Sequence, residues 1–166
     1  PLGTASDSDN RYQMSFGNAT PVECTGDIRT LVDWENYATA STATARFCRL
    51  FEGCTALTTA PELPATTLAD YCYCTMFYGC TSLTTAPELP ATTLTKHCYY
   101  EMFYKCSKLS SITMLATDIS AERCLDHWVY RVSASGTFYK NSAANWTTTG
   151  TSGIPEGWTV APTETG

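Results

Sequence analysis

The sequence predicts an α/β solenoid in which each 26-residue coil contributes one strand and one short helix, with a cap at each end. Two observations predict this fold. Residues 53–68 (GCTALTTAPELPATTL) and 79–94 (GCTSLTTAPELPATTL) differ at one position only, and a third copy from Lys105 (KCSKLSSITMLATDI) keeps their apolar positions while most polar ones change. A unit of 26 residues is too short to enclose a core alone, so each copy is expected to stack its apolar face on the next.

The residues expected inside the stack recur with the same period of 26. A fourth trace, GTFYKNS at residues 136–142, repeats the Phe-Tyr-Lys of the third copy. Tyr73 and Tyr99 align with Phe47 and are favoured as core residues, because a repeated aromatic side chain usually packs on its copies. The columns expected inside are Phe51, Phe77 and Phe103; Cys54, Cys80 and Cys106; and Leu57, Leu83 and Leu109.

Each copy is expected to contain a strand, a turn and a helix in that order. The strands are predicted at 57–60, 83–86 and 109–112, where Thr, Ser and Ile suit extended structure and a proline stops the first two. The PELP segments then turn the chain, and the following threonines are suitable helix N-caps. Apolar residues spaced by four predict one buried helix face: Leu68, Cys72 and Met76 in the first copy, and Leu94, Cys98 and Met102 in the second.

The remaining segments are expected to flank these coils. Residues 1–10 are predicted to be a tag remnant or disordered, 11–47 an N-terminal cap with one or two strands and a short helix, and 48–130 the coils. Residues 131–160 are predicted to be a C-terminal cap that closes with a hairpin or loop, in which Trp146 and Trp158 shield the last coil. Residues 161–166 are expected to form a tail.

Composition excludes several function classes. The 166 residues suit one domain, and the net charge of −6 with no cluster of Lys or Arg disfavours nucleic-acid binding. No run of about 18 apolar residues is present, so insertion into a membrane is not expected. Charged residues make up only 16%, which is common in proteins that work outside the cell.

The nine cysteines follow the repeat, and most are predicted to be buried free thiols. Disulfides between layers are the first alternative, although stacked side chains point the same way and their sulfurs would meet poorly. A metal site is a weaker alternative because no Cys-x-x-Cys pair exists, and a Cys-His nucleophile lacks a third group to orient it. The candidates for these two alternatives are Cys72 with Cys74, His97 with Cys98, and Cys124 with His127.

No motif indicates catalysis or a cofactor. The chain has no Walker loop, no Gly-x-Ser-x-Gly and no Gly-x-Gly-x-x-Gly. Glu62 and Glu88 occupy the same position of the repeat, so repetition explains them without a mechanism. We therefore expect a protein that is not an enzyme and that carries no cofactor or metal.

The segment FYGCTSLTTAPELPATTL at 77–94 resembles the BspA-like branch of leucine-rich repeats, whose units carry Phe-x-x-Cys-x-x-Leu before a proline-bounded turn. Residues 51–57, 77–83 and 103–109 match this motif, whereas 113–119 depart from it. The resemblance implies a short leucine-rich-repeat solenoid. It also implies adhesion or protein binding at the surface of anaerobic gut or oral bacteria, and related repeats occur in phage tail proteins.

Residues that differ between copies are the candidates for binding a partner, because the stack leaves them free to vary. They are expected on the solvent side of the helices, and the small residues of the strand ladder offer a competing face. The helix-side candidates are Asp70, Tyr71, Thr75, Lys96, His97, Tyr100 and Glu101, and the strand-face candidates are Thr58, Thr84 and Ser110.

The function expected from these observations is a non-catalytic extracellular recognition or adhesion module. It would bind a protein or glycan of a host or neighbouring cell through the solenoid surface. A phage tail receptor-binding module on the virion, a structural spacer and, last, a hydrolase with an unrecognised site remain alternatives. The sequence indicates no oligomeric state.

Overall fold

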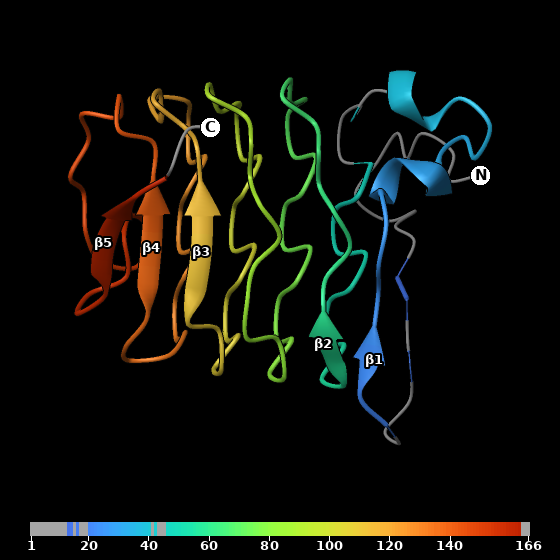
Figure 1. The fold of residues 1–166 in the computed structure, drawn as a ribbon, viewed down its shortest axis with the longest axis horizontal. Coiled ribbons are helices and arrows are strands. Elements are labelled where there is room, and N and C mark those ends of the chain that lie inside the picture. Colours follow the sequence, from blue (N-terminus) through green and yellow to red (C-terminus); the bar gives the residue numbers. More distant parts are fainter. Residues whose placement is uncertain (1–12, 15, 17–19, 41, 43–45, 164–166) are drawn as a thin grey trace.

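A computed structural model of the chain describes residues 13–14, 16, 20–40, 42 and 46–163. In it, the 26-residue copies lie side by side as successive layers of one elongated body (Figure 1). The strands form two separate parallel sheets, with β1 pairing with β2 in one and β3, β4 and β5 pairing in that order in the other. The elements are β1 (Val22–Glu23), the 3₁₀-helices η1 (Ile28–Leu31) and η2 (Tyr37–Thr39), β2 (Leu57–Thr59), β3 (Ser111–Met114), β4 (Thr137–Lys140) and β5 (Thr159–Pro162).

The expected α/β leucine-rich-repeat solenoid, with one strand and one short helix per coil, is wrong. The described residues contain no α-helix, and their strands make two small sheets instead of one ladder through every copy. Among the predicted strands, 57–60 is confirmed as β2 and 109–112 is displaced to β3. The segment 83–86 makes only an isolated bridge, between Thr85 and Ser111. The fold is therefore small and mostly β.

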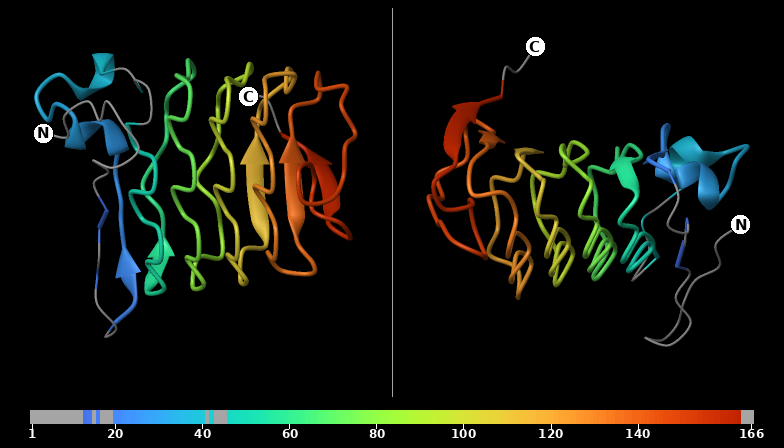
Figure 2. Two further views of the ribbon diagram at one scale, coloured as in Figure 1. Left: turned by 180° about the vertical axis from the view of Figure 1, so that it is seen from behind. Right: turned by 90° about the horizontal axis from the view of Figure 1, so that it is seen from below.

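The segments predicted as helices are instead chains of tight turns that hydrogen-bond to the next layer. Along residues 71–80, every second N–H bonds to a carbonyl three residues back, as Cys74 does to Tyr71 at 3.2 Å. The N–H groups between them donate to the neighbouring copy, as Tyr73 does to Cys98 at 3.1 Å. Half of the donors thus leave their own segment, so the i to i−4 pattern of an α-helix cannot form. These turns lie along one side of the body, opposite the strands (Figure 2).

The turns place every fourth residue in the left-handed backbone region. Between the second and third copies the residues with positive φ are His97 (52°), Glu101 (47°) and Lys105 (62°). Glycine is the residue best suited to this conformation, and Gly53 (74°) and Gly79 (73°) stand where Lys105 stands one or two copies later. The four-residue spacing that predicted a helix face is therefore the period of the turn.

A Lys105→Gly substitution is expected to leave the free energy of unfolding unchanged or to raise it by up to about 1 kcal/mol. A non-glycine residue in the left-handed region costs about 1–2 kcal/mol, and removing this strain offsets or exceeds the energy of the exposed contacts that Lys105 makes with the rings of Tyr78 and Tyr104. Urea denaturation measures the change. The control is Lys108→Gly, outside the left-handed positions, which is expected to lose about 0.5–1 kcal/mol. An equal loss of unfolding free energy in both variants would contradict the left-handed conformation of Lys105.

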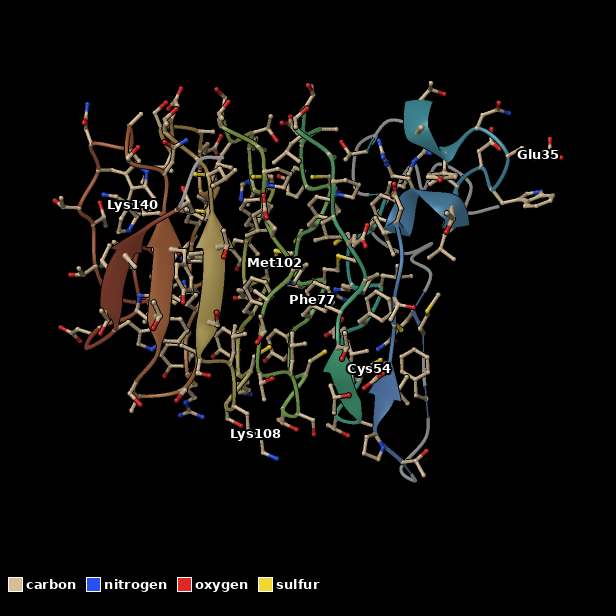
Figure 3. All side chains as sticks on the ribbon, viewed as in Figure 1. Glu35, Cys54, Phe77, Met102, Lys108 and Lys140 are labelled. Atoms are coloured by element: carbon tan, nitrogen blue, oxygen red, sulfur yellow. The ribbon has the colours of Figure 1, made fainter. Side chains whose placement is uncertain are left out.

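The core consists of the predicted columns. The phenylalanine, cysteine and leucine columns are buried, as are Tyr73 and Tyr99. The rings of Phe51 and Phe77 lie 5.5 Å apart between centroids and nearly parallel, and the next pair of the column repeats this at 5.6 Å. Figure 3 shows Phe77 and Met102 toward the middle of the body, whereas Lys108 and Glu35 extend from its periphery. Repeated sequence gives aligned side chains, and aligned rings stack.

Of the hairpin or loop expected at the C-terminal end, the structure excludes the hairpin. Residues 136–160 do not close as a hairpin, because β4 and β5 run parallel and Phe138 lies opposite Val160. Trp158 is buried, and Trp146 packs edge-on against Phe138 at 6.0 Å, as expected of shielding residues. The predicted tail is also wrong at its start, since β5 extends to Pro162.

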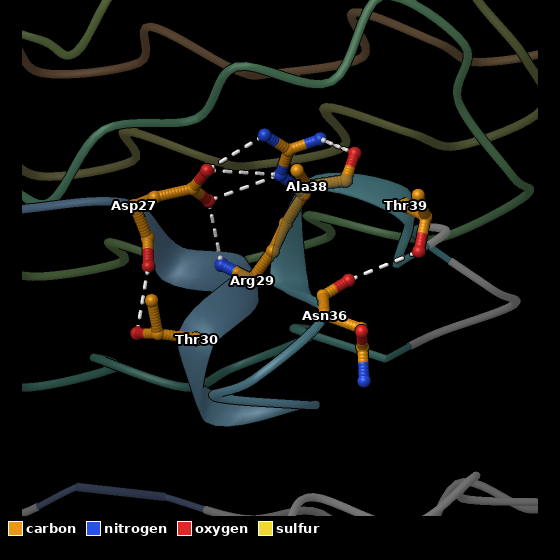
Figure 4. A network of polar contacts seen from close by, with 6 residues as sticks. All are labelled: Asp27, Arg29, Thr30, Asn36, Ala38 and Thr39. Atoms are coloured by element: carbon orange, nitrogen blue, oxygen red, sulfur yellow. Dashed lines mark hydrogen bonds and ion pairs between the residues drawn. The ribbon is translucent and has the colours of Figure 1, made fainter.

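An ion pair fixes the N-terminal cap. The Arg29 guanidinium donates to both carboxylate oxygens of Asp27, at 2.6–3.1 Å, and to the carbonyl of Ala38 at 3.0 Å (Figure 4). Burial would raise the pKa of Asp27, but the hydrogen bonds and charge of Arg29 outweigh burial and lower it. Asp27 also caps η1 by accepting from the Arg29 backbone. The predicted residues 1–10 lie outside the described part of the chain.

Candidate binding groove

The strand side of the body is interrupted between the first two copies. Residues 57–62 bond to the N-terminal cap, as Cys24 N–H does to the Thr59 carbonyl at 2.9 Å. Residues 84–94 bond to the third copy, as Leu115 N–H does to the Leu89 carbonyl at 3.0 Å. No backbone hydrogen bond joins 57–68 to 83–94, although both segments are fully described. Backbone hydrogen bonds therefore connect the two nearly identical copies on the turn side and not on the strand side.

Proline explains the interruption. Pro61 and Pro64 in the first copy, and Pro87 and Pro90 in the second, have no N–H to donate to a neighbouring strand. The third copy has Thr113 and Ala116 at these two positions, and there the four-residue strand β3 forms. The ladder is therefore absent where two proline-containing segments face each other.

A groove of about 370 Å³ opens at this interruption. Its volume lies at the small end of the range for ligand sites, about 300–1,000 Å³. Its walls are mainly proline rings and aliphatic carbons, and the exposed carboxylates of Glu62 and Glu88 complete it. The lining residues are Ala60, Pro61, Glu62, Leu63, Pro64, Pro87, Glu88 and Pro90.

A second hollow of about 430 Å³ lies between the cap and the first copy. Its walls include Arg29, η2 and the segment 64–69. The Arg29 side chain is already bonded to Asp27 and Ala38, so it offers no free charge to a ligand. The groove between the copies is the better candidate.

The structure places the predicted helix-side residues on the turns, and two of them are not solvent-facing. Thr75 is 6% exposed and bonds through its hydroxyl to the Cys74 carbonyl, and His97 is 8% exposed. Both lie at positions of positive φ. Of the others, Asp70 is exposed, and Tyr71, Lys96, Tyr100 and Glu101 are partly exposed.

Several of these turn-side residues already contact one another between layers. The Tyr71 ring stacks on His97 at 4.6 Å, and Lys96 forms an ion pair with Glu122 at 2.9 Å. The Arg123 guanidinium lies 5.0 Å from the Tyr100 ring centre. The ring faces of Tyr71 and Tyr100 and the charge of Lys96 are therefore engaged in contacts within the protein, and mainly the ring edges are accessible to a partner.

His97 predicts a loss of stability in mild acid. Burial lowers the pKa of its imidazole below the usual 6.5, the charge of Arg123 lowers it further, and Nδ1 has no hydrogen-bond partner. Below pH 6.5 the unfolded chain therefore binds this proton more readily than the folded protein does. The free energy of unfolding decreases as the pH is lowered. Urea midpoints at pH 7.5 and 5.5 measure the fall. His97→Gln should reduce it more than His127→Gln does, and equal reductions would contradict the assignment.

The strand-face candidates also serve the stack. The Thr58 hydroxyl donates to the Val22 carbonyl at 3.1 Å, and Ser110 Oγ lies 3.5 Å from the Thr84 carbonyl. Thr84 itself is exposed. Thr58 and Thr84 lie close to the groove in sequence, and none of the three side chains lines it.

Eight of the nine cysteines are buried, and Cys24 is half-buried. Cys80 and Cys106 donate their S–H groups to the carbonyls of Phe51 and Phe77, at 3.1 and 3.0 Å, which requires reduced thiols. Burial raises the pKa of Cys54 to about 11 and that of Cys106 to about 12. Since the thiolate is the reactive form, these thiols are poor nucleophiles at neutral pH.

Thiol titration with a disulfide reagent is expected to separate the native from the unfolded state. In native protein at pH 8, the buried thiols should react slowly, because burial disfavours the thiolate and blocks access. In denaturant without reductant, at least seven thiols should react at once. Fewer than seven before reduction would indicate disulfides. The seven residues are Cys24, Cys54, Cys72, Cys80, Cys98, Cys106 and Cys124.

Neither a metal site nor a membrane span is present in the part of the chain that the structure describes. No group of three or more His, Cys, Asp or Glu side chains there is arranged to hold a metal ion. Likewise, none of its helices is long and apolar enough to cross a membrane.

Comparison of the chain with family models, with curated proteins and with solved structures finds no match. The resemblance to BspA-like repeats therefore stays a prediction, and the candidate site depends on the geometry of the groove.

Sequence reasoning missed this groove. From the sequence alone, repetition explains Glu62 and Glu88, and nothing in their spacing indicates a groove. The available signal was the contrast between copies: four prolines in the first two become Thr113 and Ala116 in the third. That contrast indicates that the first two copies, which both carry the prolines, cannot pair as strands in the way that the second and third copies do.

Proposed function

We propose that this protein is a non-catalytic recognition module that works outside the cell and holds an extended segment of a partner protein in the groove between its first two copies. The observation that carries the proposal is the open, proline-walled groove at a break in the strand pairing. Extended segments commonly bind where strand pairing is incomplete, because main-chain hydrogen bonds are available there. The N–H groups of Leu63 and Glu88 donate to no acceptor among the described residues.

The surroundings support binding more than chemistry. The lining residues provide no nucleophile and no base beyond the two exposed carboxylates. The low charge content is common in proteins that work outside the cell, and the adhesive role implied by the Phe-x-x-Cys-x-x-Leu resemblance is part of the same proposal.

The test is a selection of 12-residue peptides from a phage-displayed library on the immobilised protein. Enriched peptides should bind the Pro87→Thr/Pro90→Ala variant at least ten-fold more weakly, because it carries the third copy's residues and loses two proline walls. The control is Pro162→Ala, which changes an exposed proline in β5 away from the groove. Absence of enriched peptides, or equal binding to all three proteins, would contradict the proposal.

A further inference from the structure

We propose that the groove selects a segment carrying a basic side chain, arginine best, flanked by apolar residues, and this inference rests on the proposed function. The guanidinium would lie between the carboxylates of Glu62 and Glu88, and the flanking apolar side chains would lie on the proline rings. Three features of the groove carry this inference: its uncompensated charge, its apolar walls and its size.

The charge of the groove is uncompensated. Glu62 and Glu88 occupy the same position in adjacent copies, and neither forms an ion pair in the described structure. No lysine or arginine lines the groove. Asp27 continues the row beyond Glu62, but Arg29 neutralises it, and the third copy has Met114 at the equivalent position. The groove therefore carries two carboxylates that have no cationic partner in the described structure, and a bound cation would provide one.

Arginine suits this pair better than a metal ion does. Two carboxylates are too few for a calcium site, which takes six to eight oxygen ligands. The planar guanidinium presents five donors in a fixed fork and can bond to two carboxylates at once. It is also more weakly hydrated than the ammonium of lysine, so placing it beside proline rings costs less.

The walls and the size of the groove favour a peptide over a free small cation. Its charged side chains are those of Glu62 and Glu88, whereas four prolines, Ala60 and Leu63 form the rest of the wall. A segment with apolar residues beside the arginine covers these rings and gains about 25 cal/mol for each Å² of apolar surface removed from water. A volume of about 370 Å³ accommodates one large side chain and part of its neighbours.

The experiment repeats the peptide selection on the Glu62→Gln/Glu88→Gln variant, with Glu156→Gln as the charge control. Glu156 is exposed and far from the groove in sequence, so both variants lose negative charge and only one loses the proposed partner. Peptides with a basic residue should be enriched on the wild type and on Glu156→Gln, and not on the double variant. Equal thermal melting of all three proteins shows that folding is unaffected.

A second measurement fixes the chemistry. Calorimetric titration of the strongest peptide, with its arginine replaced by citrulline, should show at least ten-fold weaker binding, because citrulline keeps the shape and loses the charge. Raising the salt concentration should weaken the arginine peptide more than the citrulline peptide.

The outcomes separate the two proposals. If enriched peptides lack basic residues, yet bind Pro87→Thr/Pro90→Ala more weakly, the recognition function stands and the charge inference is overturned. If the basic peptides bind the double glutamine variant as tightly as the wild type, the charge inference is also overturned. If no peptide is enriched on any protein, both fail.

Discussion

A Phe77→Ala substitution is expected to lower the free energy of unfolding by about 3–5 kcal/mol. The ring is fully buried and lies between Phe51 and Phe103, with centroids 5.5 and 5.6 Å away and planes within 4° of parallel. Removing it leaves a cavity between two layers, and the neighbouring rings cannot close it because each is held by its own layer. Domains of this size have about 5–15 kcal/mol in total, so the variant would be close to unfolding.

Urea denaturation followed by circular dichroism measures this loss. The control is Tyr78→Ala at the next residue, a half-buried ring that stacks on Tyr104 at 4.8 Å, for which a loss of about 0.5–1.5 kcal/mol is expected. Phe77→Leu keeps most of the volume and should cost less than the alanine variant, which keeps the test usable if Phe77→Ala fails to fold. A Phe77→Ala loss no larger than that of Tyr78→Ala would show that the phenylalanine column does not hold the layers together.

The period and the core could be predicted from the sequence because both follow from repetition. Side chains that recur every 26 residues, such as Phe51, Phe77 and Phe103, must occupy equivalent places if the copies have equivalent structures. Burial of these columns then needs no knowledge of hydrogen bonding. The same argument placed Cys80 and Cys106 inside, where their thiols bond to carbonyls of the preceding layer.

The helices could not be predicted correctly because local spacing does not distinguish two backbones. Leu68, Cys72 and Met76 recur every four residues, which fits about two turns of an α-helix and fits a chain of four-residue turns equally well. Hydrogen bonds to the next copy determine which backbone forms, such as the bond from the Thr75 N–H to the Tyr100 carbonyl at 2.8 Å. Long-range partners of this kind override local propensity, and only the aligned glycines at 53 and 79 hinted at them.

The groove marks a similar limit. Repetition predicts that every pair of neighbouring copies meets in the same way, and the turn side does so. On the strand side, Pro61 and Pro87 face each other across the interruption, whereas the next interface pairs the second copy with β3. The near-identity of the first two copies thus makes their interface different from the next one, because it places proline on both sides of that interface.

A Gly136→Ala substitution is expected to lower the free energy of unfolding by about 1–3 kcal/mol and to loosen β5. A Cβ at this position would lie 2.8 Å from Cε2 of Trp158 and would also clash with the Ser110 carbonyl oxygen. That oxygen accepts the Thr137 N–H, and the Gly136 carbonyl accepts the Thr159 N–H, both at 2.9 Å. The added methyl group therefore presses on backbone at the point where β3, β4 and β5 are joined, and backbone cannot move aside as a flexible side chain can.

Urea denaturation gives the loss for Gly136→Ala, and hydrogen exchange at the Thr159 amide reports on β5 alone. The exchange should be faster in the variant, because the clash separates β5 from β4 before the layers unfold. The matched control is Ser135→Ala, an exposed neighbour that is expected to stay within about 0.5 kcal/mol of the wild type. If Gly136→Ala stayed within the same margin with unchanged exchange, Trp158 would not be packed against the Gly136 backbone, and the closure of the C-terminal end by β5 would have to be abandoned.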